Sequence, residues 1–205
     1  TVEVRPGDNL MIHAALQLAQ PGDVIVVDGK GDLSCALTGA LMAAHPGLYM
    51  QTHLAENRDE VRWVAELFPR ARSYLDVYRH HGLLNQRAVL AHGVWLDDDD
   101  RALLAETGAQ IAHSPTSNLF LGSGCLNVDN LQRADRPVRV GLATDLGAGT
   151  SFSQLQTMNE AYKVAQLNGN ALSAWHAYYL ATRGAAHALY LDDTIGSLAP
   201  GYEAD

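Results

Sequence analysis

Short apolar runs alternate with longer segments of helical periodicity along most of the chain. The runs typical of β-strands span residues 2–5, 24–28, 48–54, 88–93, 109–113 and 138–144. The segments typical of helices span about 10–19, 33–44, 58–68, 74–81, 101–107, 151–166 and 173–189. This alternation predicts an α/β fold in which a mainly parallel sheet is flanked by helices.

The number of strands limits the architecture. Six predicted strands are fewer than the roughly eight of a closed (β/α) barrel. We therefore expect an open or partly open sheet, which is equivalent to part of a barrel. Between the fifth and sixth strands, the polar stretch 114–118 is expected to turn into a loop, which Gly122-Ser123-Gly124 closes.

Three of the predicted strands end in side chains that can bind metal or transfer protons. His53 lies near the end of one strand and is followed closely by Glu56, while His92 and Asp145 end two later strands. The carboxyl ends of parallel strands lie at one edge of a sheet, so these side chains should converge there. Imidazole nitrogen and carboxylate oxygen suit borderline divalent metals, and a carboxylate beside a metal can shuttle protons.

Simpler alternatives exist for each of these residues. A histidine at the end of a strand is, taken singly, more often a hydrogen-bonded structural residue than a ligand. Glu56 has a second reading as the N-terminal cap of the helix that follows it. His113 carries a weaker signal for the site. Four further histidines are left out of it: His80, His81, His176 and His187.

Two other polar stretches favour structural roles. The acids at 97–100 directly precede a helix, so they are interpreted as negative charge at its N-terminus rather than as a calcium loop. Gly147-Ala148-Gly149-Thr150 could cradle an anion, but a turn beside Asp145 is the favoured interpretation.

Composition excludes several classes of function. Fourteen Lys and Arg against 23 Asp and Glu give a net charge of −9, without a basic cluster, which argues against nucleic acid. No apolar run is long enough to cross a bilayer, so a membrane partner is not expected. Cys35 and Cys125 lack metal-binding spacing and are interpreted as reduced thiols, which favours a cytoplasmic location.

Four stretches of the sequence resemble the guanine deaminases of the amidohydrolase superfamily. They are QTHLAENRDEV at 51–61, AHG at 91–93, AHSPTSNLFLGSG at 112–124 and GLATDLGAGTSFSQLQTMNEAYKVAQL at 141–167. The resemblance covers about residues 44–205 and corresponds to the C-terminal half of the family. It implies part of a (β/α) barrel, a small purine substrate and a metal, zinc or alternatively iron.

The resemblance also implies a role for each residue at the strand ends. His53 matches a metal-ligand histidine that also contacts substrate, and Glu56 matches a glutamate that contacts substrate and shuttles protons. His92 matches the histidine that polarises the reacting groups. Asp145 matches an aspartate that binds the metal and accepts a proton from water. The implied reaction is hydrolytic attack at C2 of guanine, which releases ammonia and leaves xanthine.

The sequence departs from this family in two respects. The family has a His-x-His pair that supplies two more metal ligands, and no His-x-His occurs here. Residues 1–43 instead resemble the RraA-like and class II pyruvate aldolase family, through RPGDNLMIHAALQLAQPGDVIVVDGKGDL at 5–33. We therefore expect an N-terminal βαβα segment, residues 1–43, joined near 41–45 to the deaminase-like part, residues 44–205.

The main functional prediction is a guanine deaminase-like amidohydrolase, with a homo-oligomer left open. One alternative is a non-catalytic α/β scaffold or an RraA-like interaction module. A second is another amidohydrolase activity, such as that of a chlorotriazine hydrolase or an adenosine-type deaminase. Because catalytic zinc usually has at least about three protein ligands, the isolated chain is expected to deaminate guanine poorly.

Overall fold

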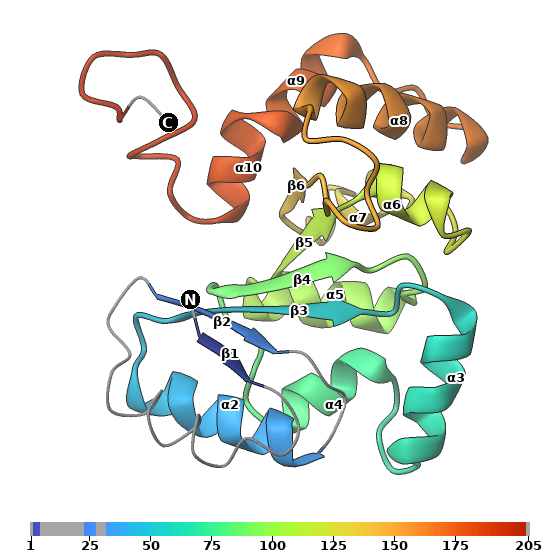
Figure 1. Cartoon of the computed structure of the whole chain (residues 1–205), viewed down its shortest axis with the longest axis vertical. Coiled ribbons are helices and arrows are strands. Elements are labelled where there is room, and N and C mark those ends of the chain that lie inside the picture. The colour runs from blue at the N-terminus through green and yellow to red at the C-terminus, as the bar shows by residue number, and fades with distance from the viewer. Residues whose placement is uncertain (1, 5–22, 28–31, 204–205) are drawn as a thin grey trace.

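The fold is built on one parallel β-sheet. The computed structural model describes residues 2–4, 23–27 and 32–203 (Figure 1). The strands are β1 Val2–Val4, β2 Val24–Val27, β3 Tyr49–Leu54, β4 Ala88–His92, β5 Gln110–His113 and β6 Val140–Leu142. They pair in the order β1-β2-β3-β4-β5-β6, and every neighbouring pair is parallel. The prediction of a mainly parallel α/β sheet is therefore confirmed.

Among the described residues, helices lie between successive strands from β2 to β6, and three more follow β6. They are α2 Asp32–Ala44, α3 Arg58–Leu67, α4 Tyr74–His80, α5 Asp98–Thr107, α6 Pro115–Phe120, α7 Val128–Leu131, α8 Gln154–Leu167, α9 Ala174–Ala181 and α10 Arg183–Ala188. Figure 1 shows α2 and α4 beneath β1 to β3, whereas α8, α9 and α10 lie beyond β6. Within the described part of the chain, β1 and β6 are the two edges of the sheet, so the sheet stays open as expected.

The main hydrophobic core lies between the sheet and the helices α2 to α5. Its fully buried large side chains include Leu41, Leu48, Met50, Leu54, Leu75, Leu83, Leu90, Leu104 and Ile111. Removing each from water contributes about 1.5–3 kcal/mol relative to exposure. A second, smaller cluster packs α8 and α9 against β6, and it consists of Leu142, Ala161, Leu172, Ala177 and Leu180. Both clusters include residues of β6, since Val140 belongs to the main core and Leu142 to the smaller one.

The acidic stretch at 97–100 forms a helix N-terminus, as predicted. The Asp97 side chain caps α5 by accepting a hydrogen bond from the backbone N–H of Asp100, and the Asp100 side chain accepts from the N–H of Asp97 in return. Arg72 adds ion pairs with both carboxylates. This reciprocal capping satisfies donors that the first helical turn would leave unpaired.

Two predictions of local structure are wrong. The single helix expected over 173–189 is broken at Thr182, whose backbone angles are φ −129° and ψ −102°. The break brings Gly184 against Tyr179, where a Cβ atom on residue 184 would lie 2.7 Å from the Tyr179 carbonyl oxygen. The loop expected at 114–118 is instead the start of α6, because Pro115 occupies the first helical turn, where its missing N–H is not needed.

The helix expected at 10–19 lies outside the described residues. Among the helices that are described, none is both long enough and apolar enough to cross a bilayer.

Candidate active site

The carboxyl ends of β3, β4 and β6 bring the predicted site residues to one edge of the sheet. In the parallel register of β3 and β4, His53 is opposite Ala91, and Leu54 is opposite His92. Glu56 lies in the short connection from β3 to α3, and Asp145 follows β6 by three residues. The topology thus delivers all four side chains from different segments to the same place.

His92 is the centre of this cluster. Its Nε2 atom lies 3.7 Å from Glu56 Oε2 and 3.9 Å from Asp145 Oδ2. The rings of His53 and His92 are stacked, with centroids 5.3 Å apart and planes 22° from parallel. The structure therefore brings His53, Glu56, His92 and Asp145 together. His92 is completely buried, Glu56 and Asp145 are partly buried, and His53 is exposed.

The backbone at this edge has unusual conformations. Ala55, His92 and Asp145 have φ values of +45°, +73° and +46°, in the left-handed region that non-glycine residues rarely adopt. Each such residue costs of the order of 1–3 kcal/mol and persists only where the surroundings enforce it. These residues follow or end β3, β4 and β6 at the candidate site, whereas Tyr190, with φ +57°, lies after α10.

Burial controls the charge of His92. Removal from water lowers the pKa of His92, whereas the nearby carboxylates of Glu56 and Asp145 act in the opposite direction and raise it. The net pKa shift is downward, so His92 is neutral at neutral pH. A neutral imidazole between two carboxylates can donate one hydrogen bond and can accept a proton during a reaction.

Further contacts to the site come from α6 and the turn after it. The sequence predicts a loop in this region. On α6, the Nδ2 atom of Asn118 lies 3.0 Å from His92 Nδ1. Just after α6, the Ser123 hydroxyl donates a 2.8 Å hydrogen bond to Glu56 Oε1. The Thr116 hydroxyl donates to the carbonyl of Thr144, next to Asp145, at 3.3 Å. These residues belong to the stretch AHSPTSNLFLGSG. Its resemblance to guanine deaminases is visible in the sequence, but the sequence assigns no role to Thr116, Asn118 or Ser123.

The alternative reading of Glu56 as a helix cap is not what the structure contains. The N-cap of α3 is Asn57, which forms a capping box with Glu60. The buried Glu60 carboxylate also accepts a 2.8 Å hydrogen bond from the backbone N–H of Glu56. Because Asn57 and Glu60 do the capping, the Glu56 side chain is available to face His92.

A chain of tyrosines extends this support to His53. The Tyr74 hydroxyl donates to Glu60 Oε1 at 3.2 Å, and the Tyr78 hydroxyl lies 3.3 Å from that of Tyr74. Tyr78 also donates a 2.7 Å hydrogen bond to the carbonyl of His53. Burial raises the pKa of both phenols, which therefore stay protonated and able to donate. Tyr78 thus holds the backbone of His53, and Glu60, which Tyr74 contacts, holds the backbone of Glu56.

The glycines after Asp145 make a turn, in agreement with the favoured interpretation. Gly149 donates its N–H to the carbonyl of Asp145 at 2.6 Å. A Cβ atom on residue 149 would lie 1.8 Å from the carbonyl oxygen of Thr144, so only glycine fits there.

The other histidines have different surroundings. His113 is buried at the end of β5, where removal from water lowers its pKa to about 3. Near the end of α4, His80 Nδ1 lies 3.0 Å from the backbone carbonyl oxygen of Asp76. His187 Nδ1 lies 2.9 Å from a carboxylate oxygen of Asp192, in a connection after α10. His92 also lowers the pKa of His113, whereas the contacts of His80 and His187 involve none of the four residues of the candidate site.

The donor types at the site fit a borderline divalent metal, but the ligand set is incomplete. His53 supplies imidazole nitrogen and Asp145 supplies carboxylate oxygen, the donors that zinc and iron accept in enzymes. Over residues 2–4, 23–27 and 32–203, no group of three or more His, Cys, Asp or Glu residues is arranged to hold a metal ion. The described residues therefore fit part of a catalytic metal site.

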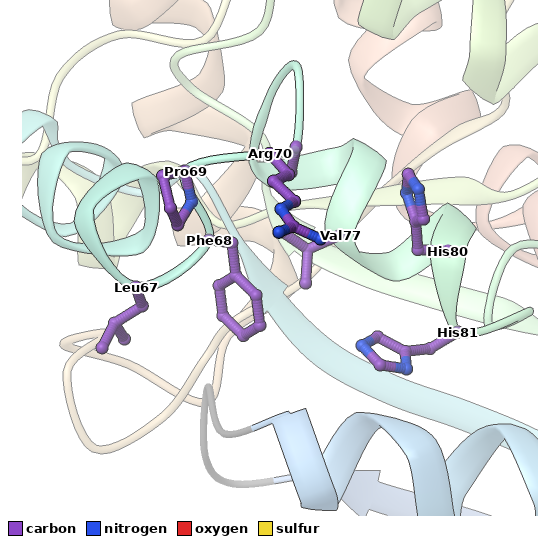
Figure 2. Close-up of a pocket in the computed structure, with 8 residues that line it drawn as sticks. Leu67, Phe68, Pro69, Arg70, Val77, His80 and His81 are labelled. Atoms are coloured by element: carbon purple, nitrogen blue, oxygen red, sulfur yellow. The ribbon is translucent and has the colours of Figure 1, made fainter.

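A cavity of about 470 Å³ lies elsewhere, along the connection between α3 and α4 (Figure 2). Its lining residues are Leu67, Phe68, Pro69, Arg70, Ala71, Val77, His80 and His81. None of the four site residues lines it, so this cavity is separate from the candidate active site.

These features are typical of α/β enzymes: side chains capable of acid–base chemistry lie at the carboxyl ends of the strands of a parallel sheet. The chain belongs to the amidohydrolase family, whose model matches residues 9–205. That match includes most of the segment 1–43. The RraA-like resemblance of that segment and the boundary near 41–45 stay predictions.

Curated and structural relatives agree with this family. The guanine deaminase of Escherichia coli (strain K12) is 49% identical over 170 residues, which cover 83% of this chain and 38% of that protein. The solved structure of E. coli guanine deaminase superimposes with a TM-score of 0.88 and 41% identity, covering 96% of this chain and 47% of that one. A zinc-bound adenosine deaminase from Xanthomonas campestris superimposes with a TM-score of 0.81 and 25% identity, covering 96% and 45%. The chain thus spans less than half the length of these relatives.

Proposed function

We propose that this chain carries part of the active site for the metal-dependent hydrolytic deamination of guanine to xanthine and ammonia. The observation that carries the proposal is the cluster of Glu56, His92 and Asp145, in which one buried imidazole nitrogen lies within 3.9 Å of two carboxylates. The similarity to guanine deaminases adds the substrate class, a small purine.

Each residue of the cluster has a role that its surroundings allow. Glu56 is the proton carrier, because its carboxylate is partly buried, is held by Ser123 and faces His92. His92 is the hydrogen-bond donor that polarises the reacting group, because it is buried and neutral. Asp145 accepts the proton of the attacking water, and its strained backbone fixes its position.

His53 and Asp145 are the residues that would hold the metal, zinc or alternatively iron. A bound metal of this kind supplies Lewis-acid activation of water. His53 is exposed at the end of β3, where it and Glu56 are also placed to contact the purine. Since two ligands are fewer than the roughly three of most catalytic zinc sites, we expect slow turnover by the chain alone.

The test is release of ammonia from guanine by the purified chain with added zinc, compared with Glu56→Gln. Activity that Glu56→Gln abolishes supports the proposed chemistry, and a high rate would show that ligands missing from the described residues are supplied elsewhere. Equal rates for the two proteins would overturn the role of Glu56. Absence of both activity and bound zinc would favour the non-catalytic scaffold.

A neighbouring activity of the family is the second candidate. The structural similarity to an adenosine deaminase is the observation that favours it. Adenosine and a chlorotriazine, assayed beside guanine, separate these activities. A higher kcat/KM for either compound than for guanine would replace our substrate assignment.

Three further properties are part of the proposal. They are a cytoplasmic location, the absence of nucleic-acid and membrane partners, and a division at residues 1–43 and 44–205. The oligomeric state is left open, and light scattering of the purified chain would determine it.

A further inference from the structure

The contact between Asn118 and His92 joins two buried side chains from different elements. Asn118 lies on α6 and is 1% exposed, and His92 at the end of β4 is completely buried. Asn118 Nδ2 lies 3.0 Å from His92 Nδ1, and no other hydrogen bond to the His92 ring is formed by the described residues. This single contact is therefore in a position to decide which ring nitrogen carries the proton.

The backbone holds Asn118 in place independently of its side chain. Its N–H donates to the carbonyl of Ser114 at 3.0 Å, and its own carbonyl accepts from the N–H of Ser123 at 2.8 Å. With this backbone fixed and the side chain 1% exposed, the amide group stays buried beside His92, and the open question is which of its two ends faces Nδ1. Two arrangements follow: either the amide NH₂ donates to an unprotonated Nδ1, or the amide oxygen accepts from Nδ1–H.

The carboxylates on the far side of the ring select between these arrangements. His92 Nε2 faces Glu56 Oε2 at 3.7 Å and Asp145 Oδ2 at 3.9 Å. A lone pair on Nε2 would be repelled by both carboxylates, whereas an N–H group there would be attracted by both. The favoured state has the proton on Nε2 and the Asn118 amide NH₂ directed at Nδ1.

We propose that Asn118 is a positioning residue that fixes His92 as the Nε2–H tautomer, so that the ring N–H is directed towards Glu56 and Asp145. The geometry on both sides of the ring supports this assignment: the Asn118 amide faces Nδ1, and the two carboxylates face Nε2. The inference rests on the proposed function for its catalytic meaning. The tautomer itself can be measured whether or not the chain turns over guanine.

The experiment is NMR of the full chain labelled with ¹⁵N in its histidine rings, at neutral pH without added metal. Two-bond ¹H–¹⁵N correlations distinguish a protonated from an unprotonated ring nitrogen, and the spectrum of His92→Gln identifies the His92 signals. We expect a protonated Nε2 and an unprotonated Nδ1 in the unmodified chain. A protonated Nδ1 would overturn the proposal without any variant being needed.

A pair of variants tests whether Asn118 is the cause. Asn118→Asp replaces the amide donor by a carboxylate of nearly the same shape, which can only accept, so we expect a proton on Nδ1. Ser117→Ala is the matched control, because Ser117 is equally buried on α6 and its hydroxyl has no hydrogen-bond partner among the described residues. An unprotonated Nδ1 in Asn118→Asp, or a changed tautomer in Ser117→Ala, would contradict the proposal.

The assays separate this inference from the proposed function. If the tautomer is as expected but no guanine is deaminated, the positioning role stands and the proposed activity fails. If guanine is deaminated but Nδ1 is protonated in the unmodified chain, the activity stands and the role of Asn118 fails.

Discussion

The hydroxyl of Ser123 donates a 2.8 Å hydrogen bond to Glu56 Oε1 across a separation of 67 residues. Ser123 is 5% exposed, so the bond is shielded from water. It ties the connection after β3 to the turn after α6. The orientation of the proposed proton carrier therefore depends on a segment that follows a different strand.

Removing this hydroxyl should impair the reaction more than the fold. A hydrogen bond to a charged group contributes about 1.5–3 kcal/mol, so Ser123→Ala should lower kcat for guanine about tenfold to a hundredfold. KM should change less, because the hydroxyl orients Glu56 for proton transfer. Ammonia release with added zinc measures both constants relative to the unmodified chain, and Ser117→Ala is the control. An unchanged kcat in Ser123→Ala would mean that Glu56 is held adequately by its backbone.

The Glu60 carboxylate should stabilise the fold, because it holds the backbone of Glu56. Its carboxylate accepts hydrogen bonds from the N–H groups of Glu56 and Asn57 and from the Tyr74 hydroxyl. Glu60→Ala leaves these donors unpaired, and we expect a loss of about 2 kcal/mol in the free energy of unfolding. Urea denaturation measures the loss.

Glu60→Gln keeps one oxygen acceptor and should lose less than Glu60→Ala. Equal losses for the two substitutions would argue against the hydrogen bonds as the source of the stability.

The strands and most helices could be predicted because burial imposes a local pattern. The β-branched run Val24-Ile25-Val26-Val27 is typical of a buried strand, the apolar run ending at Leu54 is typical of a strand, and the structure contains both. The capping box of Asn57 and Glu60 was missed, because the only cap considered for α3 from the sequence was Glu56.

Long-range contacts could not be predicted in the same way. The bond from Asn118 to His92 spans 26 residues, and the bond from Ser123 to Glu56 spans 67. Neither leaves a periodic signal, because each depends on how α6 is placed over the sheet. The break at Thr182 was missed for a related reason: the apolar periodicity continues through it, and the close contact of Gly184 with Tyr179 is tertiary.

Close packing of α2 against the end of α4 should make residue 39 intolerant of a side chain. A Cβ atom on Gly39 would lie 2.0 Å from the carbonyl oxygen of His81, a backbone atom that cannot rotate away. Gly39→Ala should therefore destabilise the fold by about 2 kcal/mol despite its better helix propensity. Thermal unfolding measures the effect, and Ala43→Ser on the exposed face of α2 is the control. A stabilised Gly39→Ala would show that α2 and α4 can separate slightly.

Acid should destabilise the fold through His113. Burial lowers the pKa of His113 to about 3 in the folded state, against about 6.5 in the unfolded chain. Between these values the unfolded state binds the proton and the folded state does not. The stabilisation is therefore complete above pH 6.5 and is lost as the pH falls towards 3.

The slope of this loss approaches about 1.4 kcal/mol per pH unit for one proton. The free energy of unfolding, measured by urea denaturation from pH 6.5 to 5, should fall less steeply in His113→Gln than in the unmodified chain. Parallel slopes would mean that His113 is protonated in the folded state at these pH values.

Zinc binding should depend on His53 and Asp145 but should be weak. These two side chains supply the donors that zinc accepts, yet most catalytic zinc sites have about three protein ligands. We therefore expect a Kd of about 1 μM or weaker, equivalent to about −8 kcal/mol or less favourable. Isothermal titration calorimetry of the purified chain measures the affinity.

Three variants test the ligand assignment. His53→Gln and Asp145→Asn should each weaken binding further. Glu56→Gln removes a proposed proton carrier and not a ligand, so it should leave the affinity nearly unchanged. Nanomolar binding would show that the ligand set is larger than the described residues supply, and weakened binding in Glu56→Gln would make Glu56 a ligand.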